Sequence, residues 1–84
     1  VIALPESVMC IGDSAFNSCD SLTSITLPAS ITSIGKCAFL DCDSLISITY
    51  QGNIAQWEEI ELCNGWNDEV PAKVVHCTDG DVEM

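Results

Sequence analysis

Residues 25–50, ITLPASITSIGKCAFLDCDSLISITY, decide the fold because they repeat residues 2–27, IALPESVMCIGDSAFNSCDSLTSITL. The two copies are 23 residues apart and are identical at 15 of their 26 aligned positions, so the chain is internally repetitive. A third copy begins at Ile48 and then departs from the pattern, with Trp57 where the second copy has Ile34. We interpret this departure as a cap that closes the array.

Each copy predicts one strand followed by a turn-rich return. Residues 24–27 alternate polar and apolar, so Ile25 and Leu27 should face a core. Beyond Gly35, which supplies a turn, Ala38, Phe39 and Cys42 have the spacing of a short helix or a tight turn. No single coil can bury its own apolar side chains, so neighbouring coils must stack around a shared core. The sequence therefore predicts an α/β solenoid, a right-handed superhelix of 23-residue coils, with Phe16 and Phe39 fully buried at stacked positions.

The pattern LPxSITSIGxxAFxxCxSL at residues 27–45 resembles the BspA-like leucine-rich repeats of bacterial surface proteins. The resemblance covers residues 1–50 closely, and the remainder resembles the C-terminal caps of such arrays. It implies a leucine-rich-repeat superhelix in a secreted or cell-surface protein, and adhesion has been suggested for some members of the family.

Three segments follow from this interpretation. Residues 1–50 form about two leucine-rich coils, residues 51–77 form a capping coil, and residues 78–84 form a polar tail that frays. In the capping coil, Asn53 should begin a short helix that continues to about Glu61, with Trp57 and Trp66 as lids. A final strand over about 73–77 should pair beside residues 48–50, with Val75 and Cys77 facing inward.

Composition and charge exclude several classes of partner. Thirteen Asp and Glu residues against two Lys and Arg give a formal net charge of -11, which repels phosphate backbones and anionic lipids. We therefore expect no nucleic-acid binding. The chain has no apolar run long enough for a membrane helix, so we expect no membrane insertion.

The six cysteines divide into three groups. Cys19 and Cys42 hold equivalent inward positions, which favours a ladder of buried thiols, because parallel side chains suit packing better than a disulfide torsion. Cys10 and Cys37 should lie on turns without a shared role. Cys63 and Cys77 both belong to the capping coil, and the sequence leaves open whether they are bridged.

No constellation for catalysis or cofactor binding is apparent. A zinc site would need four close ligands, but there is no Cys-x-x-Cys pair and His76 is the single histidine. The acidic pairs Asp41 with Asp43 and Asp79 with Asp81 supply too few oxygens for a calcium loop. Glu58, Glu59 and Glu61 are typical of a solvated helix flank. We predict a non-enzymatic chain without a metal or another cofactor.

The positions left for function are the outward residues of the strands. They are small or hydroxyl-bearing and would line one hydrogen-bonding surface: Ala3, Ser24, Thr26, Ser47 and Thr49. We predict an adhesin-like module that binds a protein or a host-surface ligand and lies outside the cell or on its surface. The alternative is a structural cap or spacer of a larger multidomain protein whose functional domains lie upstream. This face has neither an aromatic residue nor Arg, so it does not identify the ligand.

The first coil predicts a second kind of partner. Its apolar flank would face water in the absence of an earlier coil, and it comprises Ile2, Leu4, Val8, Ile11 and Phe16. An open strand edge is a template for pairing. We therefore expect upstream repeats of the same chain to stack on this edge, and expect self-association through it where such repeats are absent.

Overall fold

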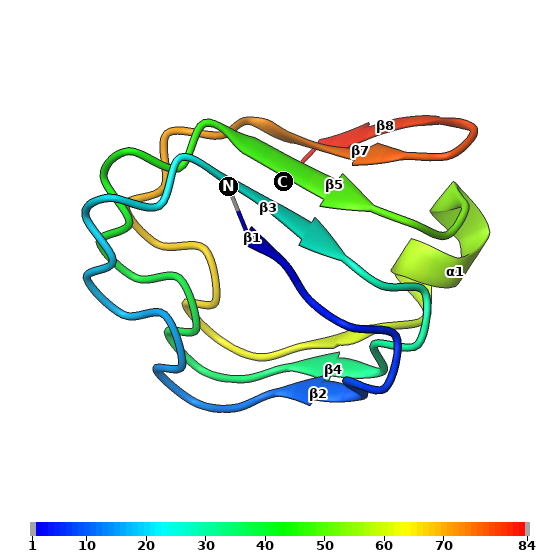
Figure 1. Ribbon diagram of the computed structural model, residues 1–84, viewed down its shortest axis with the longest axis horizontal. Coiled ribbons are helices and arrows are strands. Elements are labelled where there is room, and N and C mark those ends of the chain that lie inside the picture. The colour runs from blue at the N-terminus through cyan, green and yellow to red at the C-terminus, as the bar shows by residue number, and fades with distance from the viewer. Residues whose placement is uncertain (1, 84) are drawn as a thin grey trace.

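The computed structural model describes residues 2–83, apart from the side chain of Ile2. Successive coils place their strands in two sheets that lie opposite each other (Figure 1). Four parallel strands and one antiparallel edge strand form the larger sheet, in the order β1 (Ile2–Ala3), β3 (Ser24–Leu27), β5 (Ser47–Tyr50), β7 (Val74–Cys77) and β8 (Gly80–Glu83). The smaller sheet is parallel and contains β2 (Cys10–Ile11), β4 (Ser33–Ile34) and β6 (Glu61–Leu62).

The strand register follows the sequence period. Ile2 pairs with Ile25, and Ile25 pairs with Ile48, so each step across the sheet is one repeat of 23 residues. Along β3 the side chains alternate, with Ile25 and Leu27 buried while Ser24 and Thr26 are half-buried on the other face. The chain therefore has a solenoid-like repeat fold, as the period predicts.

Helix is scarce in this fold, since α1 (Ile54–Glu58) is the only described helix, and of the two forms expected beyond Gly35, a short helix or a tight turn, the structure has the turn. Residues 36–41 form turns, in which Cys37 and Asp41 have left-handed backbone angles, with φ of 54° and 59°. A left-handed residue every fourth position prevents a continuous helix. The return path instead carries the three-stranded sheet, which the sequence reasoning did not predict, since strands of two residues leave little alternation to detect.

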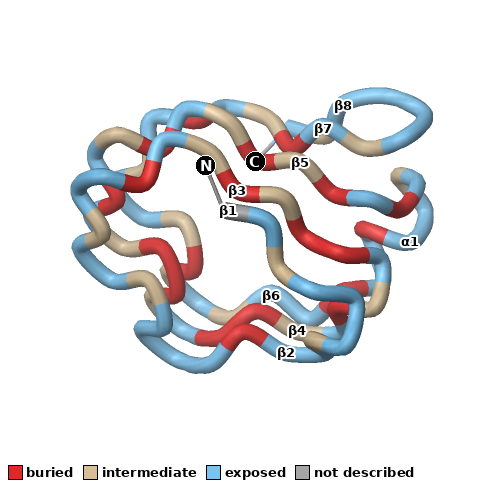
Figure 2. The backbone as a smooth tube through the Cα atoms, in the orientation of Figure 1, coloured by how far each residue is buried: buried red, intermediate tan, exposed pale blue. Residues whose placement is uncertain are grey.

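The core lies between the two sheets, and Figure 2 shows that both sheets contain buried residues. Phe39 is fully buried, as expected, and its ring contacts both Phe16 and Trp66. Phe16 is only half-buried, contrary to the prediction, because no described coil covers its far side. In the same first coil Ile11 is 4% exposed, so it does not belong to the water-facing flank, whereas Leu4 and Val8 are half-buried. Val1 and the side chain of Ile2 lie outside the described part of the chain.

The last coil is longer than the others. Val75 pairs with Ile48 at a spacing of 27 residues, four more than in the earlier coils, and α1 fills the enlarged arc between the two sheets. Asn53 begins α1, as predicted, through a capping box: its side chain accepts a hydrogen bond from the Gln56 amide, and the Gln56 side chain accepts one from the Asn53 amide. The helix ends at Glu58 and not near Glu61, because Glu61 begins β6 and pairs with Ser33.

The C-terminal strand forms where the sequence predicts it. Val75 is buried and Cys77 is partly buried against the core, which confirms both inward positions. The segment beyond it does not fray, since β8 pairs antiparallel with β7 along its whole length. Gly80 has a φ of 148°, which allows the chain to reverse between the two strands. Met84 lies outside the described residues.

Candidate functional site

The outer face of the five-stranded sheet holds the residues that the sequence proposes as a binding surface. Strand register arranges their side chains in rows that run across the sheet. One row contains Ala3, Thr26 and Thr49, and the other contains Ser24 and Ser47. Ala3 is exposed, and the four hydroxyl residues are half-buried between their neighbours in the rows. The fold therefore brings all five positions onto one face.

The last two strands extend this face beyond the predicted residues. Thr49 pairs with His76, and His76 pairs with Asp81, so the first row continues to the edge of the sheet. In the second row Val74 lies opposite Glu83. The alternation of residues 73–77 could have placed His76 on this face. The sequence analysis did not place Asp81 and Glu83 there, because it expected the tail to fray.

The side chains of His76 and Asp81 form a hydrogen bond on this face, which is an ion pair only when the imidazole is protonated. The His76 Nδ1 atom lies 2.8 Å from Asp81 Oδ1, and the two side chains are 46% and 57% exposed. An ion pair that is so open to water contributes little to stability. It does fix the orientation of the imidazole beside Thr49.

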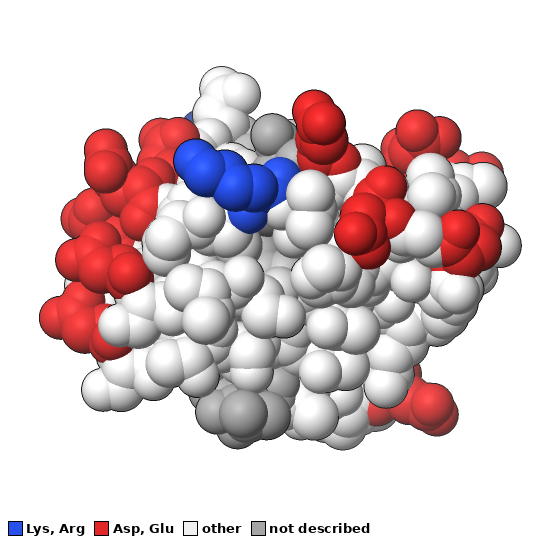
Figure 3. Space-filling model, turned by 90° about the horizontal axis from the view of Figure 1, so that it is seen from above, with Lys and Arg blue, Asp and Glu red and all other residues white. Residues whose placement is uncertain are grey.

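Charge is distributed unevenly over this side of the molecule. Figure 3 shows an area without charged side chains on the side formed by the upper strands of Figure 1, with Asp and Glu residues toward both ends and a basic side chain at its upper edge. The acidic residues belong to the turns on one side of the sheet and to the loops and hairpin on the other. A partner would therefore meet a neutral, hydroxyl-rich centre between two acidic borders.

One exposed apolar residue adjoins this face and was also missed. Ile46 directly precedes β5, and its side chain is 69% exposed. The equivalent position in the preceding coil is Thr23, and the Ile46 amide donates a hydrogen bond to the Thr23 carbonyl. The sequence did contain a signal for this exposed residue, because Ile46 is apolar where the preceding coil has Thr23. Isolated exposed apolar residues are common on protein surfaces, so Ile46 alone does not define a site.

The six cysteines are all free. Cys42 is buried, its Sγ donates a hydrogen bond to the Phe16 carbonyl at 2.9 Å, and burial raises the pKa of its thiol. Cys10 lies in β2, so the expectation that it lies on a turn is wrong, whereas Cys37 does lie on one. Cys63 follows the smaller sheet and Cys77 ends a strand of the larger sheet.

Two of the acidic side chains considered for metal binding, those of Asp79 and Asp81, each contact a different group of the protein. Asp79 Oδ1 accepts a hydrogen bond from the Ile54 amide, and Asp81 faces His76. Among residues 2–83, no three His, Cys, Asp or Glu side chains come together as metal ligands. Over the same residues, no helix is long and apolar enough to cross a membrane.

A family model described as "BspA type Leucine rich repeat region (6 copies)" matches residues 1–66, which is most of the chain. The chain belongs to the BspA-type leucine-rich repeat family. Leucine-rich repeats are generally non-enzymatic modules for protein interaction, and proteins with the BspA-type repeat are typically associated with surfaces. No curated protein and no solved structure matches the chain significantly.

Proposed function

We propose that the chain is an adhesin-like interaction module that binds a protein ligand through the outer face of its five-stranded sheet. The rows of Thr and Ser side chains across the two neighbouring strands β3 and β5 carry this proposal. Each hydroxyl can both donate and accept a hydrogen bond, so the rows suit the polar groups of a protein surface. The Thr and Ser rows themselves carry no charge, so a partner that docks on them removes water from hydroxyl groups and not from charged groups.

The proposal also includes a cellular location and details of the architecture. Family membership supports a protein that acts outside the cell or on its surface. We propose a right-handed superhelix, since parallel strands joined by a crossover are right-handed in about 98% of cases. We also propose that residues 51–77 are the cap, and that coils of the same repeat stack on the β1 edge.

A structural cap or spacer is the second candidate, and the hairpin favours it. β8 is antiparallel to its neighbour, whereas every other pair in the sheet is parallel. Asp81 and Glu83 also put negative charge on this edge strand, which discourages another strand from pairing there. A module that served only to end the array would need these features and no ligand.

The test compares binding with and without an intact sheet face. Purified protein would be passed over a panel of immobilised extracellular-matrix proteins, and any binding would be measured by surface plasmon resonance. Thr26→Arg with Thr49→Arg should abolish binding, because two bulky cations would interrupt the row. Asn17→Arg with Asn64→Arg adds the same charge on exposed turns and should leave binding unchanged. Equal binding by both variants would contradict the proposed face, and the absence of any binding across the panel would favour the spacer.

A further inference from the structure

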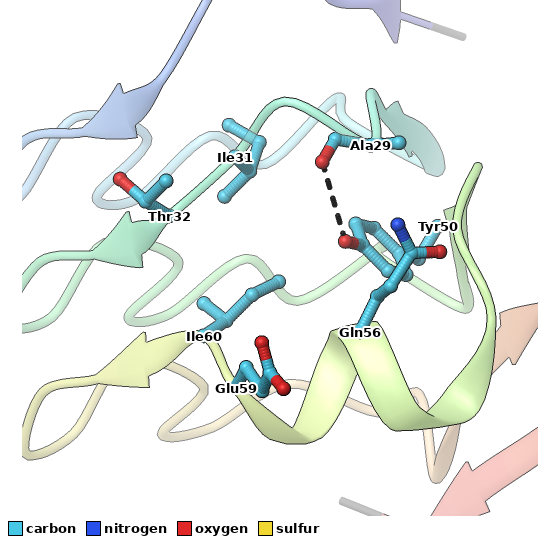
Figure 4. Close-up of a pocket in the computed structure, with 7 residues that line it drawn as sticks. All are labelled: Ala29, Ile31, Thr32, Tyr50, Gln56, Glu59 and Ile60. Carbon is cyan, nitrogen blue, oxygen red and sulfur yellow. Dashed lines mark hydrogen bonds between the residues drawn. The ribbon is translucent and has the colours of Figure 1, made fainter.

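A separate pocket lies away from the sheet face, between α1 and the return path of the second coil. Its volume is about 210 Å³, and it is lined by Ala29, Ile31, Thr32, Tyr50, Gln56, Glu59 and Ile60. Figure 4 shows these side chains arranged around one open space, with Ala29 and Tyr50 on one side and Ile31 and Ile60 on the other. The pocket lies in the last coil, where the arc between β5 and β6 contains α1 and is five residues longer than the arc between β3 and β4.

Hydrogen-bond acceptors border this space. The Tyr50 hydroxyl donates a long hydrogen bond of 3.4 Å to the Ala29 carbonyl, so the lone pairs of the hydroxyl oxygen and one of the carbonyl remain available. The Glu59 carboxylate lies at the end of α1 beside Ile60 (Figure 4). Burial is the main cause that raises the pKa of Tyr50, and the charges of Cys77 and Glu59 add to it. The field of Glu59 therefore reaches the pocket.

Within residues 2–83, no basic side chain pairs with this carboxylate. The chain's only basic side chains other than His76 are Lys36 and Lys73, and within residues 2–83 neither forms an ion pair with Glu59. Ile31 and Ile60 offer apolar walls close to the acceptors. A carboxylate beside two neutral acceptors and an aliphatic wall matches an ammonium group on an alkyl chain, which has three donors and an apolar stem.

We propose that this pocket binds a primary ammonium group on an alkyl chain, as in a lysine side chain presented by a partner protein. The ammonium would lie among the Glu59 carboxylate, the Tyr50 hydroxyl and the Ala29 carbonyl, with its stem against Ile31 and Ile60. Gln56 favours a lysine within a peptide over a free amine. Its side-chain oxygen already accepts from the Asn53 amide, which leaves the NH₂ group to donate to a peptide carbonyl. The pocket is a site additional to the sheet face and does not depend on it.

The experiment titrates the whole chain with N-acetyl-lysine methylamide and follows the amide signals of residues 29–32 and 54–60 by NMR. n-Butylammonium chloride tests the free amine, and N-acetyl-norleucine methylamide tests the stem without its charge. Glu59→Gln should weaken binding of the lysine probe by about fivefold, the upper range for an exposed ion pair. Glu58→Gln is the matched control, because it removes one charge from an exposed residue of the same helix and should change binding less than twofold.

Each outcome bears on the proposal. Shifts confined to the pocket with the lysine probe, lost with norleucine and weakened only by Glu59→Gln, would support it. Stronger binding of butylammonium than of the lysine probe would still support an ammonium site and would identify a free amine as the source. No pocket shifts with either amine, or equal losses in the Glu58 and Glu59 variants, would overturn it.

Discussion

The rings of Phe16 and Phe39 are stacked, with centroids 5.2 Å apart and planes within 2° of parallel. The two residues hold the same position in successive coils, but only Phe39 has an aromatic neighbour on its other side, Trp66 at 6.2 Å. Phe39→Ala should therefore destabilise the chain by about 3–5 kcal/mol, as expected for a large cavity in a core. Phe16→Ala is the control and should cost less, because Phe16 is already partly exposed to water. Urea titrations followed by circular dichroism would measure both, and equal losses would contradict the difference in burial.

A second matched pair is provided by Gly12 and Gly35, which are one repeat apart. A Cβ atom on Gly35 would lie 2.6 Å from the Asp13 backbone nitrogen and 2.7 Å from the Gly12 carbonyl carbon. Backbone atoms cannot move aside, so Gly35→Ala should cost about 1–3 kcal/mol, the range for overpacking. Gly12 has no atom within 4 Å of its Cβ position. Gly12→Ala should be neutral or stabilise by up to about 1 kcal/mol, because alanine restricts the unfolded chain.

Thermal melts of the two alanine variants at one protein concentration would test this pair. A loss of stability with Gly12→Ala as large as that with Gly35→Ala would show that the two coils are not packed in the described order. The comparison is sharp because the substitution, the repeat position and the local sequence, Ile-Gly, are the same in both variants.

The sequence predicted the repeating strands of the larger sheet, the start of α1 and the place of β7, but it missed the short strands β2, β4 and β6 and the edge strand β8. A 23-residue period predicts the register of β1, β3 and β5, and an offset of one residue would bring polar residues opposite Ile25 and Ile48 in the core. β8 has no counterpart in the earlier coils, and its polar residues are typical of a tail, so pairing with β7 could not be read from composition. The pocket beside Tyr50 depends on where α1 lies in three dimensions. Sequence spacing alone does not bring Glu59 and Ala29 together.

Alkaline pH should destabilise the fold. Burial raises the pKa values of Cys42 and Tyr50 above their ordinary values of 9.0 and 10.0, and burial followed by the charges of Asp79 and Asp81 raises that of Cys77. Above about pH 9 the unfolded chain loses protons that the folded chain still holds, so the unfolded state binds fewer protons and the free energy of unfolding falls as pH rises. Below that range these three groups are protonated in both states and contribute no pH dependence.

Urea titrations at several pH values from 7 to 11 would measure this slope. Cys42→Ala and Tyr50→Phe should each make the decline above pH 9 shallower, since each removes one of the groups whose protonation differs between the two states. At pH 7 to 8 each variant should run parallel to the unsubstituted chain. A decline that is equally steep in both variants and in the unsubstituted chain would show that other groups cause it.

The last prediction concerns two sets of left-handed residues that recur from coil to coil. Ser14 and Cys37 are one repeat apart, and Gly65 takes the same place in the last coil. Ser18 and Asp41 form the second set with φ near 59°, and Glu69 completes it with φ of 60°. Glycine therefore occupies one of the two left-handed positions of the last coil, and a residue with a Cβ atom occupies the other. Glu69 should store strain, because a side chain costs about 1–2 kcal/mol in this conformation.

Glu69→Gly should relieve that strain and raise the free energy of unfolding by up to about 1 kcal/mol, after the greater flexibility of glycine in the unfolded chain is subtracted. Glu69→Ala is the matched control, because it removes the same carboxylate from the acidic turn but keeps the Cβ atom. If both variants gained equally in urea titrations, relief of charge repulsion would explain the gain. A gain confined to glycine would show that the turn itself, which recurs in each coil, is strained, and that the stacking of coils holds it in place.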